Sequence, residues 1–130
     1  MLASSKAFNG FAVDDLDEAR QFYGETLGLK VEVLDEENGL LSLHLPGDRD
    51  TLIYLSPGMR PPSYTILNFP VDDIDEAVDG LVARGVSFEQ YGNDDLPQDG
   101  KGVMREGGPL IAWFKDPAGN TLSVLQESSD

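Results

Sequence analysis

Apolar and polar residues alternate along much of this chain, and two stretches instead repeat their apolar residues at helical spacing. The helical stretches are residues 15–27 and 73–85, and each is followed by a glycine that can end a helix, Gly28 and Gly85. Residues 91–108 are polar and rich in glycine and aspartate, which predicts a loop with a short strand near Val103. The alternating stretches predict strands at 6–13, 29–33, 40–45, 51–55, 63–71, 86–90, 110–114 and 121–125.

A heptapeptide occurs twice and relates the two halves of the chain. Residues 13–19 read VDDLDEA and residues 71–77 read VDDIDEA, so the two copies differ only at Leu16 and Ile74. Each copy ends an apolar stretch and then supplies an aspartate followed three residues later by a glutamate, which is the spacing of a capping box. We interpret these acids as ordinary helix caps that mark the start of each predicted helix.

The repeat divides the chain into two modules of the same element order. Each module reads as a strand, a helix and three further strands, a βαβββ unit of the α+β class. Module one covers about residues 6–56, a Pro-rich linker covers 57–62, and module two covers about 63–127, together forming one domain over residues 1–130. Two curved mixed sheets of this kind would enclose a shared cleft, which is the natural place for a ligand.

Charge and composition narrow the choice of partners. The chain has 9 basic and 24 acidic side chains and a formal net charge of −15, so nucleic acid and anionic membrane surfaces are not expected partners. A cationic small molecule would be attracted, although solubility alone also accounts for this charge. The absence of cysteine excludes disulfides. The N-terminus lacks a signal-peptide pattern, and no apolar run reaches roughly 18 residues. With the absence of cysteine, these features lead us to expect a cytoplasmic protein without a membrane span.

Two motifs carry a resemblance to a known family. Phe22-Tyr23 followed by Leu27-Gly28, and the DPAGN sequence of residues 116–120, occur in the order found in vicinal oxygen chelate proteins. That superfamily includes glyoxalase I, extradiol dioxygenases, fosfomycin-resistance transferases and bleomycin-resistance proteins. The chain resembles it over nearly its whole length, which implies the fold strongly and the reaction weakly, because this fold hosts many chemistries.

The resemblance also implies where a metal would be held. Enzymes of this superfamily mostly chelate a divalent metal through four residues, and the matching positions here are Phe8, Ile53, Ile66 and Ser123, with Tyr54 in place of Ile53 if the register slips by one. Aromatic, aliphatic and neutral hydroxyl side chains are poor ligands for such ions. We therefore expect no metal site and no cofactor.

Three other residues are candidates for contact with a ligand in the cleft. Asn68 lies two residues after Ile66 and should share its strand face, and it could equally bond the neighbouring sheet. Trp113, the sole tryptophan, would offer a flat apolar wall, with core filler as the alternative. His44, the sole histidine, corresponds to Trp113 in the repeat, but either hairpin register is possible, and a solvent-facing histidine is the simpler interpretation.

These observations favour a metal-free protein that binds a small organic molecule in an apolar cleft, without identifying the ligand. The alternative is an enzyme, lyase or isomerase-like, that uses His44 or an unorthodox metal site. A third hypothesis is a regulatory partner whose cleft is vestigial. Family members of this length often pair, so a homodimer is expected by analogy.

Overall fold

The computed structural model describes residues 1–91, 98–106 and 108–127. The chain forms two compact units, Met1–Arg60 and Pro61–Asp130, and the division between them falls within the Pro-rich segment 57–62. No helix in these described stretches is both long and apolar enough to cross a membrane. Each unit combines a small mixed sheet with a helix, so the expected α+β class is confirmed.

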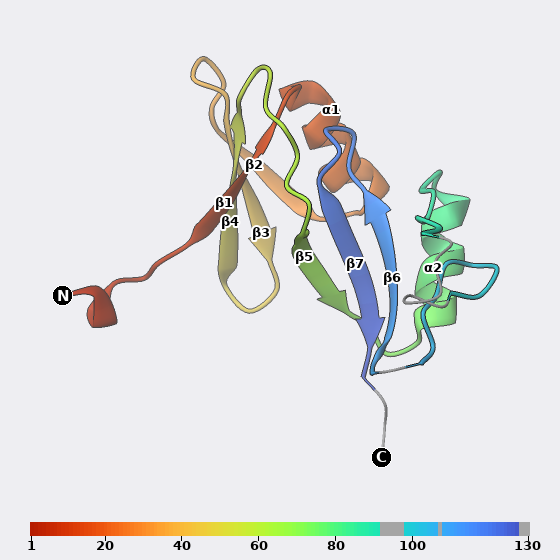
Figure 1. Cartoon of the computed structure of the whole chain (residues 1–130). Coiled ribbons are helices and arrows are strands. Elements are labelled where there is room, and N and C mark those ends of the chain that lie inside the picture. Colours follow the sequence, from red (N-terminus) through yellow and green to blue (C-terminus); the bar gives the residue numbers. More distant parts are fainter. Residues whose placement is uncertain (92–97, 107, 128–130) are drawn as a thin grey trace. The chain divides into compact units, whose positions relative to one another are not determined.

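The first unit has the βαβββ order that its sequence predicts (Figure 1). The sheet has the strand order β1-β4-β3-β2, with β1 parallel to β4 and the other neighbours antiparallel. Its elements are β1 (Asn9–Val13), α1 (Leu16–Gln21), a π-helical turn η2 (Phe22–Thr26), β2 (Lys30–Asp35), β3 (Leu40–Leu45) and β4 (Arg49–Leu55).

The second unit repeats this order with one strand reduced. Its elements are β5 (Thr65–Pro70), α2 (Ile74–Ala83), β6 (Leu110–Lys115) and β7 (Thr121–Gln126), and its sheet has the order β5-β7-β6. The prediction of a continuous strand at 86–90 is wrong, because within this stretch only Phe88 forms a β-bridge, and its partner is Phe114. The predicted short strand near Val103 is likewise reduced to isolated bridges, from Met104 to Gln98 and from Met104 to Ile111.

Both helices begin where the repeated heptapeptide places them. Asp15 accepts a hydrogen bond from the backbone N–H of Glu18 at 3.0 Å, and Asp73 accepts one from Glu76 at 3.1 Å. The helix predicted to reach residue 27 ends as an α-helix at Gln21 and continues as the π-helical turn. Gly28 follows with a φ of 73°, which glycine adopts readily and which lets the chain turn into β2.

One face of each sheet is buried against its own helical segment. In the first unit Phe11 contacts Tyr23 of the π-helical turn with ring centroids 5.5 Å apart, and both residues are buried. In the second unit the Gln126 side chain accepts a hydrogen bond from the N–H of Ile74, the first residue of α2, at 2.9 Å. Since side chains alternate along a strand, Leu122 and Val124 share this helix-facing side of β7 with Gln126.

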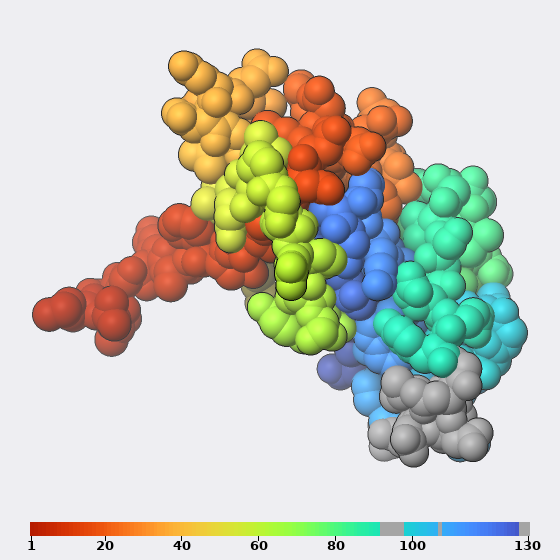
Figure 2. Space-filling view, turned by 45° about the horizontal axis from the view of Figure 1, so that its top comes forward, coloured from red at the N-terminus to blue at the C-terminus, as the bar shows by residue number. Residues whose placement is uncertain are grey.

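The first strand is shorter than its sequence predicts. Residues 6–13 form an apolar-polar pattern, but β1 begins only at Asn9, and a short 3-10 helix, η1 (Leu2–Ser4), precedes it. Residues 1–8 project from their unit (Figure 2), and Phe8 is 70% exposed. No strand extends over Phe8, because the pairing of β1 with β4 starts at Asn9 and Thr51.

The capping role of the repeated aspartates is testable in the second helix. Replacing Asp73 by alanine removes the acceptor for the N–H of Glu76, and we expect the free energy of unfolding to fall by about 1 kcal/mol. Urea unfolding measures this loss. Asp72→Ala removes the same charge one residue earlier and should change stability by less than about half as much. Equal losses in the two variants would contradict the capping role.

Candidate ligand-binding face

The strand registers divide each sheet into a helix-facing side and a side that we call the helix-free face. A residue and its direct partner on the next strand point to the same side, so one anchored residue assigns its whole row. Gln126 and Phe11 anchor the helix-facing sides of the two sheets through their contacts with helical residues. The residues that alternate with them form the helix-free faces.

Three predicted site residues lie in one row across the helix-free face of the second sheet. Ser123 on β7 pairs with Asn68 on β5 and with Trp113 on β6. Ser123 alternates with Leu122 and Val124, which face the helix, so the row points to the opposite side. The structure therefore brings together Asn68, Ser123 and Trp113, which come from distant parts of the second module.

A hydrogen bond joins the first two members of this row. The Ser123 hydroxyl donates to Asn68 Oδ1 at 2.6 Å, and Ser123 is fully buried while Asn68 is exposed. Because the oxygen of the Asn68 amide is engaged, this bond turns the amide nitrogen, with its two N–H groups, outward from Ser123. A ligand with a carbonyl or another acceptor is the complement of such a group.

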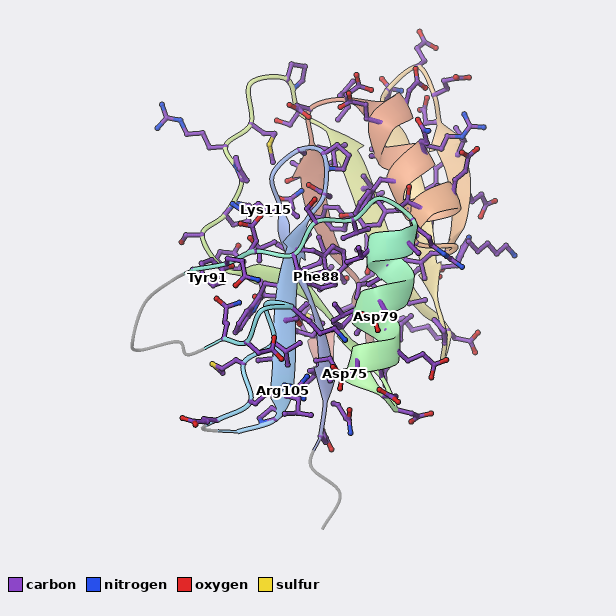
Figure 3. The ribbon with its side chains drawn as sticks, turned by 90° about the vertical axis from the view of Figure 1, so that its right-hand side faces the viewer. Asp75, Asp79, Phe88, Tyr91, Arg105 and Lys115 are labelled. Atoms are coloured by element: carbon purple, nitrogen blue, oxygen red, sulfur yellow. The ribbon has the colours of Figure 1, made fainter. Side chains whose placement is uncertain are left out.

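Trp113 is extended into an aromatic wall by a residue that the sequence analysis did not select. The ring of Tyr91 packs against Trp113 with centroids 5.6 Å apart and an angle of 69° between the planes. Tyr91 lies on the side of β6 away from α2 (Figure 3). Burial is the larger cause, and the nearby Glu89 carboxylate the smaller cause, of a raised pKa of the Tyr91 phenol. No local sequence signal marks Tyr91, because its position depends on a backbone bond from Glu89 to Trp113 and on Gln98.

In the first sheet the structure selects Tyr54 over Ile53. Ile53 pairs with Phe11 on β1 and is completely buried on the helix-facing side. Tyr54, the next residue, points to the helix-free face and is 40% exposed. Ile53 is therefore not on the helix-free face, whereas Tyr54, the residue that the slipped register gives, is on that face.

Two other predicted positions lack a fixed place in their sheets. Phe8 precedes β1 and is mostly exposed, so it belongs to the projecting segment rather than to the sheet. Ile66 lies at a register shift in β5, between Thr65, which pairs with Thr121, and Leu67, which pairs with Leu122. An extra residue at such an irregularity has no direct partner, so the strand pairing does not place Ile66 in the row with Asn68.

His44 lies on the helix-free face of the first sheet between two carboxylates. Its Nδ1 lies 2.6 Å from Asp50 Oδ1, and its Nε2 lies 2.8 Å from Glu32 Oε2. The hydrogen bond with Asp50 and then that with Glu32 raise the pKa of His44 above its ordinary value of 6.5. The structure does not support the predicted correspondence with Trp113. Gly10, the counterpart of Asn68 in the repeat, pairs with Leu52, and Leu52 pairs with Ser42, so the counterpart of Trp113 is Ser42, two residues before His44.

The donor chemistry of these positions does not suit a divalent metal. Within the parts of the chain that the structure describes, no three or more histidine, cysteine or acidic side chains gather so that they could hold an ion. His44, Glu32 and Asp50 do not form such a group, because the two carboxylates bond opposite nitrogens of the ring and cannot share one ion with it. The hydroxyl of Ser123 is already donated to Asn68.

Comparison with known proteins identifies the family. Residues 7–124 match the model of the glyoxalase/bleomycin resistance protein/dioxygenase superfamily, and the chain belongs to this superfamily. A probable lactoylglutathione lyase of Synechocystis is 30% identical over 90% of this chain and 91% of its own length. The antibiotic-binding protein TnmS3 of a Streptomyces species is 27% identical with a TM-score of 0.67, covering 96% of this chain and 98% of TnmS3.

A further solved structure supports the same fold. A superfamily member from Sphaerobacter thermophilus is 27% identical with a TM-score of 0.68, over 95% of this chain and 98% of its own. The sequence resemblance to the superfamily is thus confirmed. Its members named here include a lyase-like protein and an antibiotic-binding protein, so the family alone does not choose between catalysis and binding.

The environment of His44 predicts a specific dependence on pH. Because folding raises its pKa, protonated His44 stabilises the folded state fully below 6.5, and the contribution is lost as the pH rises through the folded-state pKa. We expect His44→Gln to be less stable than the natural chain near pH 6 and to match it near pH 9, measured by urea unfolding at about these two values.

Direct titration of the ring provides the control for this prediction. The C–H proton resonances of the only histidine should report a pKa above 6.5, and Asp50→Asn or Glu32→Gln should each lower it. Asp48→Asn removes a nearby acid that has no recorded bond to the ring and should leave the pKa unchanged. A natural chain that titrates at or below 6.5 would contradict the two-carboxylate geometry.

Proposed function

We propose that this protein binds a small organic molecule, without a metal ion, on the helix-free face of its second sheet. The observation that carries the proposal is the row of Asn68, Ser123 and Trp113 across neighbouring strands, with Tyr91 packed against Trp113. It combines a flat apolar wall with one oriented polar group, which is the usual composition of a small-molecule site.

The chemistry of the row favours a planar ligand with a hydrogen-bond acceptor. Trp113 and Tyr91 offer aromatic surface for stacking or edge contacts, and Asn68 offers amide N–H groups beside them. The formal charge of −15 would attract a cationic molecule and repel an anion, and it would not oppose the approach of a neutral one. The antibiotic-binding relative supports this class of ligand without identifying the one that this chain binds.

The proposal that no metal takes part depends on the side chains at the family's ligand positions. With Tyr54 in place of Ile53, these positions carry Phe8, Tyr54, Ile66 and Ser123, which together supply two hydroxyl groups and no carboxylate, imidazole or thiolate. Divalent ions in proteins need several of the latter donors. Binding energy must then come from apolar contact and hydrogen bonds, which agrees with the aromatic wall in the second sheet.

Binding can be measured through Trp113, because it is the only tryptophan in the chain. A panel of planar neutral, cationic and anionic compounds, with bleomycin included, should contain neutral or cationic members that quench Trp113 emission and raise the melting temperature. Asn68→Ala should weaken the binding of such a compound by about tenfold, since it removes a hydrogen bond to the ligand. Asn38→Ala, in the turn between β2 and β3, is the matched control and should leave affinity unchanged.

Two outcomes of this experiment would count against the proposal. One is that no compound at high concentration changes either the emission of Trp113 or the melting temperature. The other is that Asn68→Ala and Asn38→Ala weaken binding equally, which would place the ligand away from the row.

The lyase-like relative favours an enzyme as the second candidate function. His44 is a poor general base in this arrangement, because both ring nitrogens lie within hydrogen-bond distance of carboxylates that stabilise its protonated form. An enzyme of this kind would therefore need a metal held by unorthodox ligands. Elemental analysis of the purified protein distinguishes the two candidates, since stoichiometric zinc, nickel, iron or manganese would overturn metal-free binding.

Pairing of two chains belongs to the same proposal. By analogy with family members of this length, we propose a homodimer in which modules of two chains complete each cleft. Light scattering of the purified protein tests this, and a monomer at the concentrations at which the ligand binds would contradict it.

A further inference from the structure

Gln98 makes an unusual set of side-chain contacts next to the aromatic wall. Its Oε1 accepts a hydrogen bond from the backbone N–H of Tyr91 at 2.8 Å. Its Nε2 donates to the carbonyl of Glu89 at 2.8 Å and to that of Gly102 at 2.6 Å. One amide thus satisfies three backbone groups, and two of them belong to the segment that carries Tyr91.

These bonds replace the strand pairing that is missing at this edge of the second sheet. The segment that carries Tyr91 does not form a strand of the sheet. It bonds the sheet through the Glu89 N–H, which donates to the carbonyl of Trp113. A segment with few backbone hydrogen bonds to the neighbouring strand can detach from the sheet unless other hydrogen bonds hold it. Gln98 joins it instead to the segment 98–105, whose Met104 exchanges two backbone hydrogen bonds with Ile111 of β6.

The segment that carries Gln98 is itself anchored to α2 by charged side chains. Asp99 accepts hydrogen bonds from the backbone of Lys101 and Val103 and from Arg105 Nε, the last at 2.7 Å. Arg105 reaches Asp75 on α2 at 2.6 Å, and Lys101 reaches Asp75 at 3.1 Å and Asp79 at 2.9 Å. Figure 3 shows Asp75 and Asp79 on α2 and Arg105 on the neighbouring segment.

The charges in this anchor stabilise one another. The hydrogen bond from Arg105, and then that from Lys101, lower the pKa of Asp75, so its carboxylate stays ionised at neutral pH. Single exposed ion pairs contribute little, but a network of several charges can order a segment. The anchor therefore limits how far Gln98 can move from its three backbone partners.

We infer that Gln98 is a positioning residue for the ligand-binding face, because it holds Tyr91 against Trp113 through its hydrogen bonds to the backbone of Tyr91 and Glu89. Tyr91 then completes the aromatic wall before a ligand arrives, which lowers the entropy cost of binding. This inference rests on the proposed function for its biological meaning. The contact of Tyr91 with Trp113 can nevertheless be measured without any ligand.

The test follows the accessibility of Trp113 to acrylamide by fluorescence quenching. Gln98→Met keeps the length of the side chain and removes its polar groups, so the ratio of detached to docked Tyr91 should rise by roughly fivefold or more. Quenching should increase toward the level of Tyr91→Ala. The double variant should show no further increase over Tyr91→Ala, because both changes act on the same contact.

Gln90→Met is the matched control, since the neighbouring Gln90 side chain makes a single 3.3 Å hydrogen bond to the carbonyl of Gly100 and none to Tyr91. Acrylamide should quench Trp113 in this variant to the same extent as in the natural chain. Far-ultraviolet circular dichroism verifies that each variant folds. If Gln98→Met does not fold, Gln98→Glu takes its place, because it keeps the acceptor for Tyr91 and loses both donors.

Three results would overturn the inference. The first is unchanged quenching in the Gln98 variant while Tyr91→Ala increases it, and the second is additive effects in the double variant. A Tyr91→Ala variant that quenches like the natural chain would also overturn it, since the contact would then be absent. If a ligand is found but the fluorescence tests fail, only the role of Gln98 is lost. If they succeed and no compound binds, only the proposed function is lost.

Discussion

Burial of one side of each sheet against its own helix is the constraint on which the other features depend. Helix-facing side chains such as Ile53 and Leu122 are completely buried, and the alternation of side chains then fixes what every other strand residue does. A slip of one residue would exchange the two sides of a strand, so a buried face defines the register strongly. The packing of the helix-facing side therefore also determines which residues form the rows on the helix-free faces.

The sequence predicted the elements that depend on local chemistry. The repeated aspartates cap both helices, and the strands from Leu40 to Leu45 and around residues 121–125 lie where alternation places them. It failed where the answer depends on pairing. Whether Ile53 or Tyr54 lies on the helix-free face is decided by the partner of Phe11 on the neighbouring strand, and no pattern within residues 51–55 contains that information.

The candidate site shows the same division between local and distant information. Ser123 was predicted from a motif position, Asn68 from strand alternation and Trp113 as the sole tryptophan, and the registers bring the three into one row. Tyr91 and the two carboxylates around His44 were not predicted. Asp50 lies outside the predicted strand 51–55, whereas β4 begins at Arg49 and pairs Asp50 with His44 directly. The backbone N–H of Tyr91, whose ring packs on Trp113, donates to Gln98, seven residues later in the chain, and no local pattern contains that contact.

The hydroxyl of Ser123 shows what a small polar side chain can do in the row that it shares with Asn68 and Trp113. A carboxylate at this position would face its partner on β5 as an acceptor, whereas a serine can donate, and it does so to Asn68 at 2.6 Å. The bond engages the oxygen of the Asn68 amide, so the amide N–H groups face away from Ser123. One hydrogen bond thus satisfies a fully buried hydroxyl and also sets the direction of a hydrogen-bond donor on an exposed residue.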